Sequence, residues 1–333
     1  MCKIGIIGAG TWGLAIANLL SKNCHQVTVY ARSDIQAENL TKKRKHEKLK
    51  GLHLDKSIKF TSDLGIAVAN KEVIVIAVPS VAFREATNEV LKFSNGKEYF
   101  VTLTKGMEDK TLYTMSEIIE DELRKAKIKN KKIVALSGPT HAEEVSVNMP
   151  SMAVSASKNL KAAKYIQDVF MNENFRVYTN SDIKGVETCA AFKNVIGLAS
   201  GMVAGLGYGD NIKAAVITRG LAEMIRAGKA LGCKKDTFYG LAGLGDMVVT
   251  ATSTHSRNYR CGELIGKGIE PNKAIKDIGM VVEGVNFLPK AMKIISKYKL
   301  ELPITEAIYE IVYNGEKVKD MLSLLMLRSK KSE

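Results

Sequence analysis

Short β-branched runs alternate with helical patterns along the first half of the chain. In such an alternation the strands pair mostly in parallel, and the helices between them cover both faces of the sheet. The runs predicted as strands are Lys3 to Ile7, Gln26 to Tyr30, Glu72 to Ala77, Tyr99 to Leu103, Lys132 to Leu136, Ser151 to Ser155 and Arg176 to Tyr178. We therefore predict an α/β fold whose N-terminal domain holds a doubly wound, mostly parallel sheet.

The pattern changes after Asp182, where helical spacing replaces the β-branched runs. One predicted helix buries a face and carries charges on another face; the buried set is Ile217, Leu221, Met224, Gly228 and Leu231, and the charged set is Arg219, Glu223 and Arg226. Further helices are predicted at Tyr259 to Gly266, Asn286 to Tyr298, Thr305 to Asn314 and Val318 to Leu327. The C-terminal domain is thus predicted to be all-α, and we divide the chain into residues 1–185 and 186–333.

Composition places the chain among ordinary globular proteins, with 46% hydrophobic and 25% charged residues. The cysteines are scattered and odd in number, which argues against a disulfide framework or a zinc ribbon and favours a reducing compartment. The first ten residues lack the basic and apolar regions of a signal peptide. The longest uncharged stretch, between Lys193 and Asp210, is broken by glycines and is too short to span a bilayer. We expect a cytoplasmic protein without an integral membrane segment.

The net charge is +14, which suits an anionic partner of some kind. Most of the excess is dispersed lysine. The one dense basic run, from Lys42 to Lys50, has no aromatic residues on which bases could stack. We therefore expect this run to be a solvated surface and predict no nucleic-acid partner; attraction of an anionic ligand or a polyanion is the alternative.

A glycine-rich turn follows the first predicted strand and opens the helical pattern Leu14 to Leu20. In such a turn the first glycine permits a tight bend, the second lets the backbone approach a pyrophosphate, and the third allows a helix to pack closely on a strand. N–H groups at the helix N-terminus then meet the phosphates. We predict dinucleotide binding, with a structural glycine turn as the alternative; the residues concerned are Gly8, Gly10, Thr11, Trp12 and Gly13.

Arg32 stands just beyond the second predicted strand, where an NAD-specific site usually carries Asp or Glu for the ribose 2′-hydroxyl. A guanidinium suits a 2′-phosphate instead. The sequence therefore favours NADP and leaves NAD open, and a solvated loop arginine is the alternative.

Lys193 lies in a helical segment among small and apolar neighbours. The residues three and four positions away, Cys189, Ala190, Ile196 and Gly197, offer no carboxylate to pair with it. Burial of this kind lowers the pKa of a lysine toward the range of a general base. A surface lysine whose stem covers apolar groups is the alternative.

Two segments further along the chain suggest ligand contacts. The stretch Gly240 to Asp246 is glycine-rich and ends in a carboxylate, which suggests a close approach to a ligand and a hydrogen bond from a hydroxyl to Asp246. Thr254 to Asn258 is an N-cap cluster before a helix, with Arg257 placed to reach an anion, although simple capping is the other interpretation. The sequence contains no phosphate-loop lysine motif, nucleophile elbow or H-E-x-x-H pair, and no metal is needed.

Taken together, these motifs resemble the NAD(P)-dependent glycerol-3-phosphate dehydrogenases of the bacterial type. The resemblance runs from Gly8 to about Gly284. Its landmarks stand in order as GAGTWG (8–13), AVPS (77–80), TKGME (104–108), SGPTHAEEV (137–145), KNVIGLASG (193–201), GLGYGDN (205–211), TRGLAEM (218–224), GLAGLGD (240–246), SRN (256–258) and VVEG (281–284).

The resemblance implies an N-terminal Rossmann-type domain, an NADP or NAD cofactor and a reversible reaction between sn-glycerol 3-phosphate and dihydroxyacetone phosphate that supplies phospholipid synthesis. It assigns proton transfer to Lys193, with support from Lys105, Asp246 and Thr250. Substrate contacts fall by resemblance on Lys105, Gly138, Thr140, Lys193, Asn194, Asp246, Ser256, Arg257 and Asn258, of which Arg257 and Asn258 would hold the phosphate. Cofactor contacts fall on Lys105, Ala142, Arg257, Val281 and Glu283 in addition to the glycine-rich turn and Arg32.

The sequence departs from the family pattern at two places. Cys189, Ala190 and Ala191 stand where glycines are usual, and His141 stands where an aromatic residue is usual, which puts local packing in doubt but not the role of Lys193. We expect a small phosphorylated substrate and a homodimer. The rival hypotheses are a ketopantoate or 6-phosphogluconate type of reductase, a cofactor-binding sensor without turnover, and a nucleic-acid binder.

Overall fold

The computed structural model describes residues 1–330 and 332, so residues 331 and 333 of the predicted second domain lie outside the described residues. The chain falls into two compact units. One comprises Met1–Glu108 and Tyr113–Glu187, and the other comprises Asp109–Leu112 together with the chain from Thr188 onward.

The first unit contains every strand of the described residues: β1 Lys3–Ile7, β2 Gln26–Tyr30, β3 Lys59–Thr61, β4 Val73–Ile76, β5 Tyr99–Thr102, β6 Ile133–Ser137, β7 Ser151–Ala156 and β8 Phe175–Asn180. Its helices are α1 Thr11–Lys22, α2 Asp34–Lys43, α3 Leu64–Val68, the short η1 Ser80–Ala82, α4 Phe83–Leu91, α5 Met115–Lys125, α6 Ala142–Ser146 and α7 Leu160–Phe170.

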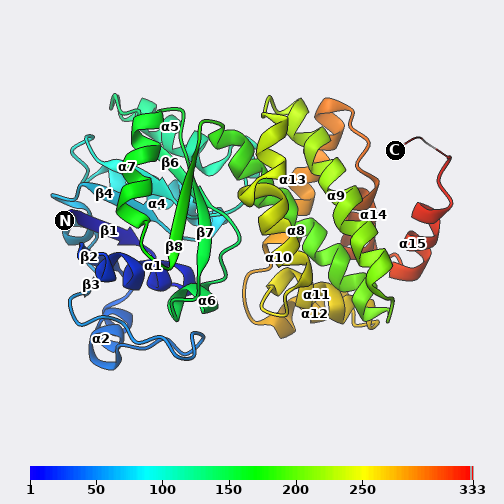
Figure 1. Ribbon diagram of the computed structural model, residues 1–333, viewed down its shortest axis with the longest axis horizontal. Coiled ribbons are helices and arrows are strands. Elements are labelled where there is room, and N and C mark those ends of the chain that lie inside the picture. The colour runs from blue at the N-terminus through cyan, green and yellow to red at the C-terminus, as the bar shows by residue number, and fades with distance from the viewer. Residues whose placement is uncertain (331, 333) are drawn as a thin grey trace. The chain divides into compact units, whose positions relative to one another are not determined.

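The strands form one sheet in the order β3-β2-β1-β4-β5-β6-β7-β8 (Figure 1). Neighbouring strands are parallel except for β6 and β7, which are antiparallel. The predicted doubly wound, mostly parallel sheet is confirmed. Strand β3 was missed because its three residues, Lys59 to Thr61, follow a lysine-rich loop and show no apolar alternation.

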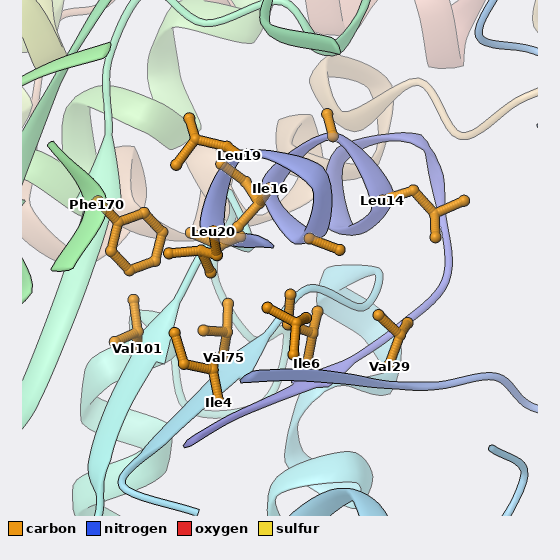
Figure 2. Close-up of a cluster of buried hydrophobic side chains, with 14 of the residues drawn as sticks. Ile4, Ile6, Leu14, Ile16, Leu19, Leu20, Val29, Val75, Val101 and Phe170 are labelled. Atoms are coloured by element: carbon orange, nitrogen blue, oxygen red, sulfur yellow. The ribbon is translucent and has the colours of Figure 1, made fainter. Parts of the chain in front are cut away.

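Alternate residues of β1 serve opposite faces of this sheet. Ile4 and Ile6 pack beneath α1; Leu20 points down toward Ile4, Leu14 lies on the side of Val29, and Phe170 at the end of α7 joins the same cluster (Figure 2). On the other face a Cβ at Gly5 would lie 2.0 Å from the carbonyl oxygen of Ala67, so only glycine lets α3 approach β1 this closely. Burying one large aliphatic side chain in such a core contributes about 1.5–3 kcal/mol.

The second unit is helical. Its elements are α8 Ile183–Gly205, which begins in the first unit, α9 Asp210–Ala230, η2 Lys235–Tyr239, the π-helical η3 Leu241–Gly245, α10 Asp246–Thr252, α11 Arg257–Gly266, α12 Pro271–Ile278, α13 Glu283–Tyr298, α14 Pro303–Asn314 and α15 Val318–Met326. The described chain beyond Asn180 contains no strand, so the predicted all-α half is confirmed.

The predicted polar face of α9 is wrong at one residue. Glu223 is only 1% exposed. Its carboxylate accepts hydrogen bonds from the backbone N–H groups of Ile304 (2.6 Å) and Thr305 (3.0 Å), at the first turn of α14. The glutamate is buried because it satisfies donors at a helix N-terminus that no intrahelical carbonyl can reach.

A four-residue stretch, Asp109–Leu112, leaves the first unit in sequence and belongs to the second. The Lys293 ammonium on α13 donates to the carboxylate (3.0 Å) and to the backbone carbonyl (3.2 Å) of Asp109. The chain therefore passes between the units at residues 108/109, 112/113 and 187/188. In residues 1–330 and 332, every helix is too short or too polar to cross a lipid bilayer.

Candidate active site

Lys193 is a buried charged residue of the second unit, which α8 holds with 5% of its surface exposed. Its ammonium donates to Oδ1 of Asp246 at 2.5 Å and to the hydroxyl oxygen of Thr250 at 2.6 Å. Asp246 and Thr250 are four residues apart on α10 and thus share one face of that helix. Both are buried, so the three groups form a buried, charge-paired cluster.

The segment before Asp246 is wound as a π-helix, η3. A Cβ at Gly243 would lie 2.1 Å from the carbonyl oxygen of Phe238, so glycine is required where this turn packs on η2. Single π-turns recur next to functional residues because they offset the side chains that follow. Here the π-turn leads directly into α10, at whose first position Asp246 stands.

A chain of amide hydrogen bonds lies beside Lys193. Asn194 donates through Nδ2 to the carbonyl oxygen of Ala190 (3.0 Å) and accepts at Oδ1 from Nδ2 of Asn258 (2.9 Å). The oxygen of Asn258 in turn accepts from the backbone N–H of Gly284 (2.8 Å). A Cβ at Gly284 would lie 2.6 Å from the carbonyl oxygen of Asn194, so this approach requires glycine. The chain of bonds fixes the orientation of both amides and joins α8, α11 and α13.

Arg257 stands at the first position of α11, directly after the cap. The hydroxyl oxygen of Ser256 accepts from the backbone N–H of Tyr259 (3.2 Å), so the predicted capping is confirmed for Ser256. The Arg257 guanidinium donates to the carbonyl oxygen of Val281 (2.9 Å), and Glu283 begins α13 two residues later. Arg257 and Asn258 thus lie at a helix N-terminus, where partial positive charge favours an anion.

In the first unit, the glycine-rich turn divides its tasks among three glycines. Gly8 has φ +121° and leaves no room for a Cβ, which would lie 2.5 Å from the carbonyl oxygen of Ala77. A Cβ at Gly13 would lie 2.2 Å from the carbonyl oxygen of Gly8, so α1 packs directly on the turn. Gly10, the N-cap of α1, instead faces open space, and a Cβ there would meet no neighbouring atom within 4 Å. This open backbone before a helix N-terminus fits a dinucleotide pyrophosphate.

Arg32 is exposed and follows the end of β2 by two residues. The N–H of Gly8 donates to the carbonyl oxygen of Tyr30 (3.3 Å), so the glycine-rich turn and the end of β2 lie side by side. Asp34, which begins α2, accepts a hydrogen bond from the Ser62 hydroxyl. This nearby carboxylate is not among the residues that the sequence motifs single out.

Lys105 lies in the loop after β5. Its ammonium donates to the carbonyl oxygen of Gly138 at 3.4 Å, and the hydroxyl of Thr140 donates to the same oxygen at 3.2 Å. Ala142 begins α6 two residues further on, with His141 as its N-cap. The structure therefore gathers Lys105, Gly138 and Thr140 around one carbonyl group of the first unit.

Comparison with known proteins shows the family. The family model of the NAD-dependent glycerol-3-phosphate dehydrogenase N-terminus matches residues 3–163, and that of the C-terminus matches residues 182–323. The chain belongs to the NAD-dependent glycerol-3-phosphate dehydrogenase family. The resemblance inferred from the sequence motifs is thereby confirmed.

Individual glycerol-3-phosphate dehydrogenases match this chain over its whole length. It is 48% identical to an NAD(P)+ glycerol-3-phosphate dehydrogenase of Lactobacillus delbrueckii subsp. bulgaricus, covering 100% of this chain and 99% of the relative. It is 46% identical to the enzyme so named in Bacillus subtilis, covering 100% of this chain and 96% of the relative.

Among solved structures, the glycerol-3-phosphate dehydrogenase of Coxiella burnetii has a TM-score of 0.91 at 31% identity, covering 98% of this chain and 99% of that one. A ketopantoate reductase of Ralstonia eutropha has a TM-score of 0.60 at 13% identity, covering 96% and 99%, which shows a shared fold alone.

One expectation from the sequence needs correction. Lys193 has no carboxylate among its helix neighbours, but Asp246 supplies one from 53 residues away. This opposite charge stabilises the buried ammonium, and the sequence neighbours of Lys193 do not reveal it. The stretch Gly240 to Asp246 contains the π-turn η3, whose Gly243 packs on Phe238, and its predicted close approach to a ligand stays a prediction.

The two departures from the family pattern lie on α8, for Cys189 to Ala191, and at the N-cap of α6, for His141. Cys189, Ala190 and Ala191 are buried on α8, and the carbonyl of Ala190 is the acceptor that orients Asn194. The sequence motifs gave no role to Gly284 beyond its place in VVEG. Nothing near Gly284 in the sequence shows that its N–H holds Asn258.

Proposed function

We propose that this protein interconverts sn-glycerol 3-phosphate and dihydroxyacetone phosphate with NAD(P) as cofactor. The observation that carries the proposal is the buried Lys193, paired with Asp246 and Thr250, in a chain of the glycerol-3-phosphate dehydrogenase family. An oxidoreductase of this class needs a proton donor beside the carbonyl that receives hydride. A buried, oriented ammonium provides one.

Bound NAD(P)H supplies the hydride that C2 of the ketone receives. In that direction Lys193 donates one proton from its ammonium to the developing alkoxide oxygen, and the product is the C2 alcohol. In the reverse direction the neutral amine accepts the hydroxyl proton. Asp246 and Thr250 hold Nζ by hydrogen bonds of 2.5 and 2.6 Å, so the group that moves the proton keeps its orientation.

By resemblance, Lys105 is assigned to catalysis through its positive charge, with Gly138 and Thr140 as further substrate contacts. Arg257 and Asn258 bind the substrate phosphate, helped by Asn194 and Ser256. The support is their place at the N-terminus of α11 and the fixed orientation of the Asn258 amide. Ala142, Val281 and Glu283 are assigned to the cofactor by resemblance alone.

The cofactor residues proposed are Gly8, Gly10, Thr11, Trp12, Gly13 and Arg32. The open space at Gly10 supports a bound pyrophosphate, and the exposed Arg32 beside this turn supports a 2′-phosphate and hence NADP. Replacing the guanidinium by a carboxylate, Arg32→Asp, should shift kcat/KM toward NADH by tenfold or more, since one charge-assisted hydrogen bond contributes about 1.5–3 kcal/mol. An unchanged ratio of the two kcat/KM values would contradict the assignment.

The decisive experiment follows oxidation of NADPH and of NADH on addition of dihydroxyacetone phosphate. Ketopantoate and 3-keto-6-phosphogluconate serve as controls for the related reductases. Turnover specific for dihydroxyacetone phosphate is expected. Turnover of ketopantoate in its place would support the rival reductase, and tight NADPH binding with no turnover of any ketone would support a sensor.

We further infer a homodimer in a reducing, cytoplasmic compartment, with its product glycerol 3-phosphate directed to phospholipid synthesis. The support for a dimer is the apolar surface at the end of α15, where Leu324, Met326 and Leu327 are 61%, 71% and 81% exposed. Apolar residues exposed together on one surface, unlike ones exposed singly, mark protein–protein contacts. Sedimentation velocity at micromolar concentration should give twice the chain mass, and a monomer would contradict the inference.

A further inference from the structure

The loop that carries Lys105 is fastened on both sides of that lysine. Immediately before it, the hydroxyl of Thr104 donates to the carbonyl oxygen of Val78 (2.7 Å), in the segment that follows β4. Three residues after it, the N–H of Glu108 donates to the carbonyl oxygen of Tyr113 (2.9 Å), which closes the loop on itself. Gly106 between them has φ +134°, a backbone conformation that only glycine adopts readily.

The side chain of Glu108 provides a second fastening. Arg84, at the second position of α4, donates from Nε to Oε1 of Glu108 (2.5 Å) and from Nη2 to Oε2 (2.7 Å). The two side chains are 26% and 19% exposed. Such a fork of two parallel bonds fixes direction as well as distance, which a single bond cannot do.

The other nitrogen of the same guanidinium holds α5. Nη1 of Arg84 donates to Oδ2 of Asp121 and to Oε1 of Glu122, both at 2.5 Å. Hydrogen bonds from Lys125, and then from Arg84 and Arg124, hold the pKa of the Asp121 carboxyl well below its usual range. The α5 side of this network therefore stays ionised at neutral pH, and Arg84 lies between it and the loop.

We propose that Arg84 is a positioning residue for Lys105. Arg84 and Val78 belong to the same stretch of chain after β4. The Thr104–Val78 hydrogen bond and the Arg84–Glu108 ion pair therefore attach the loop that carries Lys105 to one segment. Together they keep the Lys105 ammonium within reach of the Gly138 carbonyl and of a ligand oxygen there. The proposal rests on the proposed function, which assigns Lys105 to substrate binding and catalysis.

The first test follows amide hydrogen exchange of residues 103–108 and needs no substrate. Arg84→Gln and Glu108→Gln should each speed exchange of these amides by about tenfold, because each removes the fork. Asp121→Asn is the matched control: it weakens the opposite side of the same guanidinium and should leave this segment protected. Unchanged exchange in both test variants would overturn the proposal.

The second test is a double-mutant cycle with Lys105→Met. Arg84→Gln and Glu108→Gln should each lower kcat/KM for dihydroxyacetone phosphate about tenfold, whereas Arg84→Lys should recover part of the loss. In the Lys105→Met background neither should cause a further loss. Equal losses in both backgrounds would overturn the proposal, since Arg84 would then act independently of the lysine.

The two tests separate this proposal from the function on which it rests. If the unmodified protein does not turn over dihydroxyacetone phosphate, the proposed function fails, and the exchange experiment still decides whether Arg84 fastens the loop. If turnover is normal but exchange and kinetics are both unaffected by Arg84→Gln, the function stands and the positioning role fails.

Discussion

The glycine-rich turn of the first unit and the lysine cluster of the second are built in opposite ways. The turn is continuous in sequence, from Gly8 to Gly13, and its open backbone faces no protein atom at Gly10. The cluster draws Lys193, Asp246 and Thr250 from α8 and α10 and buries all three. A backbone site needs local geometry and open space, whereas a charged site away from water needs partners that only tertiary packing can bring. Variants of the two should therefore differ in what they damage.

The largest effect is expected from Lys193→Met, which removes the proton donor but keeps the apolar stem. The constant kcat should fall by about 10²–10⁴, the usual contribution of general acid–base catalysis. Binding of NADPH, which depends on the turn in the other unit, should change little. Lys193→Arg should not restore activity because a guanidinium stays protonated.

Stopped-flow measurement of hydride transfer checks this expectation, with NADPH fluorescence titration as the binding control. Near-normal hydride transfer in Lys193→Met would refute the assignment, and Lys105 would then become the leading candidate.

The second-largest effect is expected from Asp246→Asn, which should lower the free energy of unfolding. It leaves the Lys193 ammonium buried without its carboxylate, and removing one partner of a buried ion pair costs about 3–5 kcal/mol. Urea unfolding measures the loss. The double variant Lys193→Met, Asp246→Asn is the control and should be more stable than Asp246→Asn alone, because no buried charge remains. The opposite order would show that the pair is not the source of the loss.

Glu187 offers a contrast to Asp246: both carboxyls are buried, but Glu187 is held by neutral donors and not by an ammonium. It accepts from the backbone N–H (2.8 Å) and the hydroxyl (2.5 Å) of Ser116 at the start of α5, and burial raises its pKa to about 7 from 4.5. The folded state thus binds the proton more tightly than the unfolded state. The contribution of Glu187 to the free energy of unfolding is therefore fully present below pH 4.5. It falls by about 3 kcal/mol as the pH rises through 7.

Glu187→Gln should remove this part of the pH dependence. Urea unfolding of both proteins at about pH 5 and about pH 8, on either side of the raised pKa, checks it: the unmodified chain should lose more stability between these values than the variant does. A parallel change in the two proteins would show that Glu187 is ionised throughout.

The smallest change in stability is expected in the turn itself. Gly10→Ala places a methyl group in open space, so the free energy of unfolding should change by less than about 1 kcal/mol while the Kd for NADPH rises. Gly13→Ala is the matched comparison, because its Cβ would lie 2.2 Å from the carbonyl oxygen of Gly8 and should lower Tm as well. Calorimetry and NADPH titration distinguish the two. Unchanged NADPH binding in Gly10→Ala would place the pyrophosphate elsewhere.

The sequence was most informative where function depends on neighbouring residues. The strand periodicity, the tasks of Gly8 and Gly13 and the N-cap Ser256 are all properties of short segments, and the structure bears out each of them. It was least informative where a side chain meets a distant partner. Nothing near Glu223 in sequence shows that it caps α14.

The same limit applies to the candidate site. The resemblance named Asp246 and Asn258 through their motifs, but the ion pair and the amide chain they form follow from helix packing. Strand β3 could not be predicted from the sequence because its three residues have no apolar alternation. Its pairing with β2 defines it instead.

The excursion of Asp109–Leu112 into the second unit bears on how such proteins can be recombined. A fragment that ends at Glu187 would carry Asp109 without Lys293, and a fragment that begins at Thr188 would carry Lys293 without Asp109. A chimaera of two relatives joined at residue 187 therefore takes residues 109–112 from one parent. It takes Lys293, which binds Asp109, from the other parent. The two halves are modular in fold but interleaved in chain, so a working exchange must transplant residues 109–112 along with the helical half.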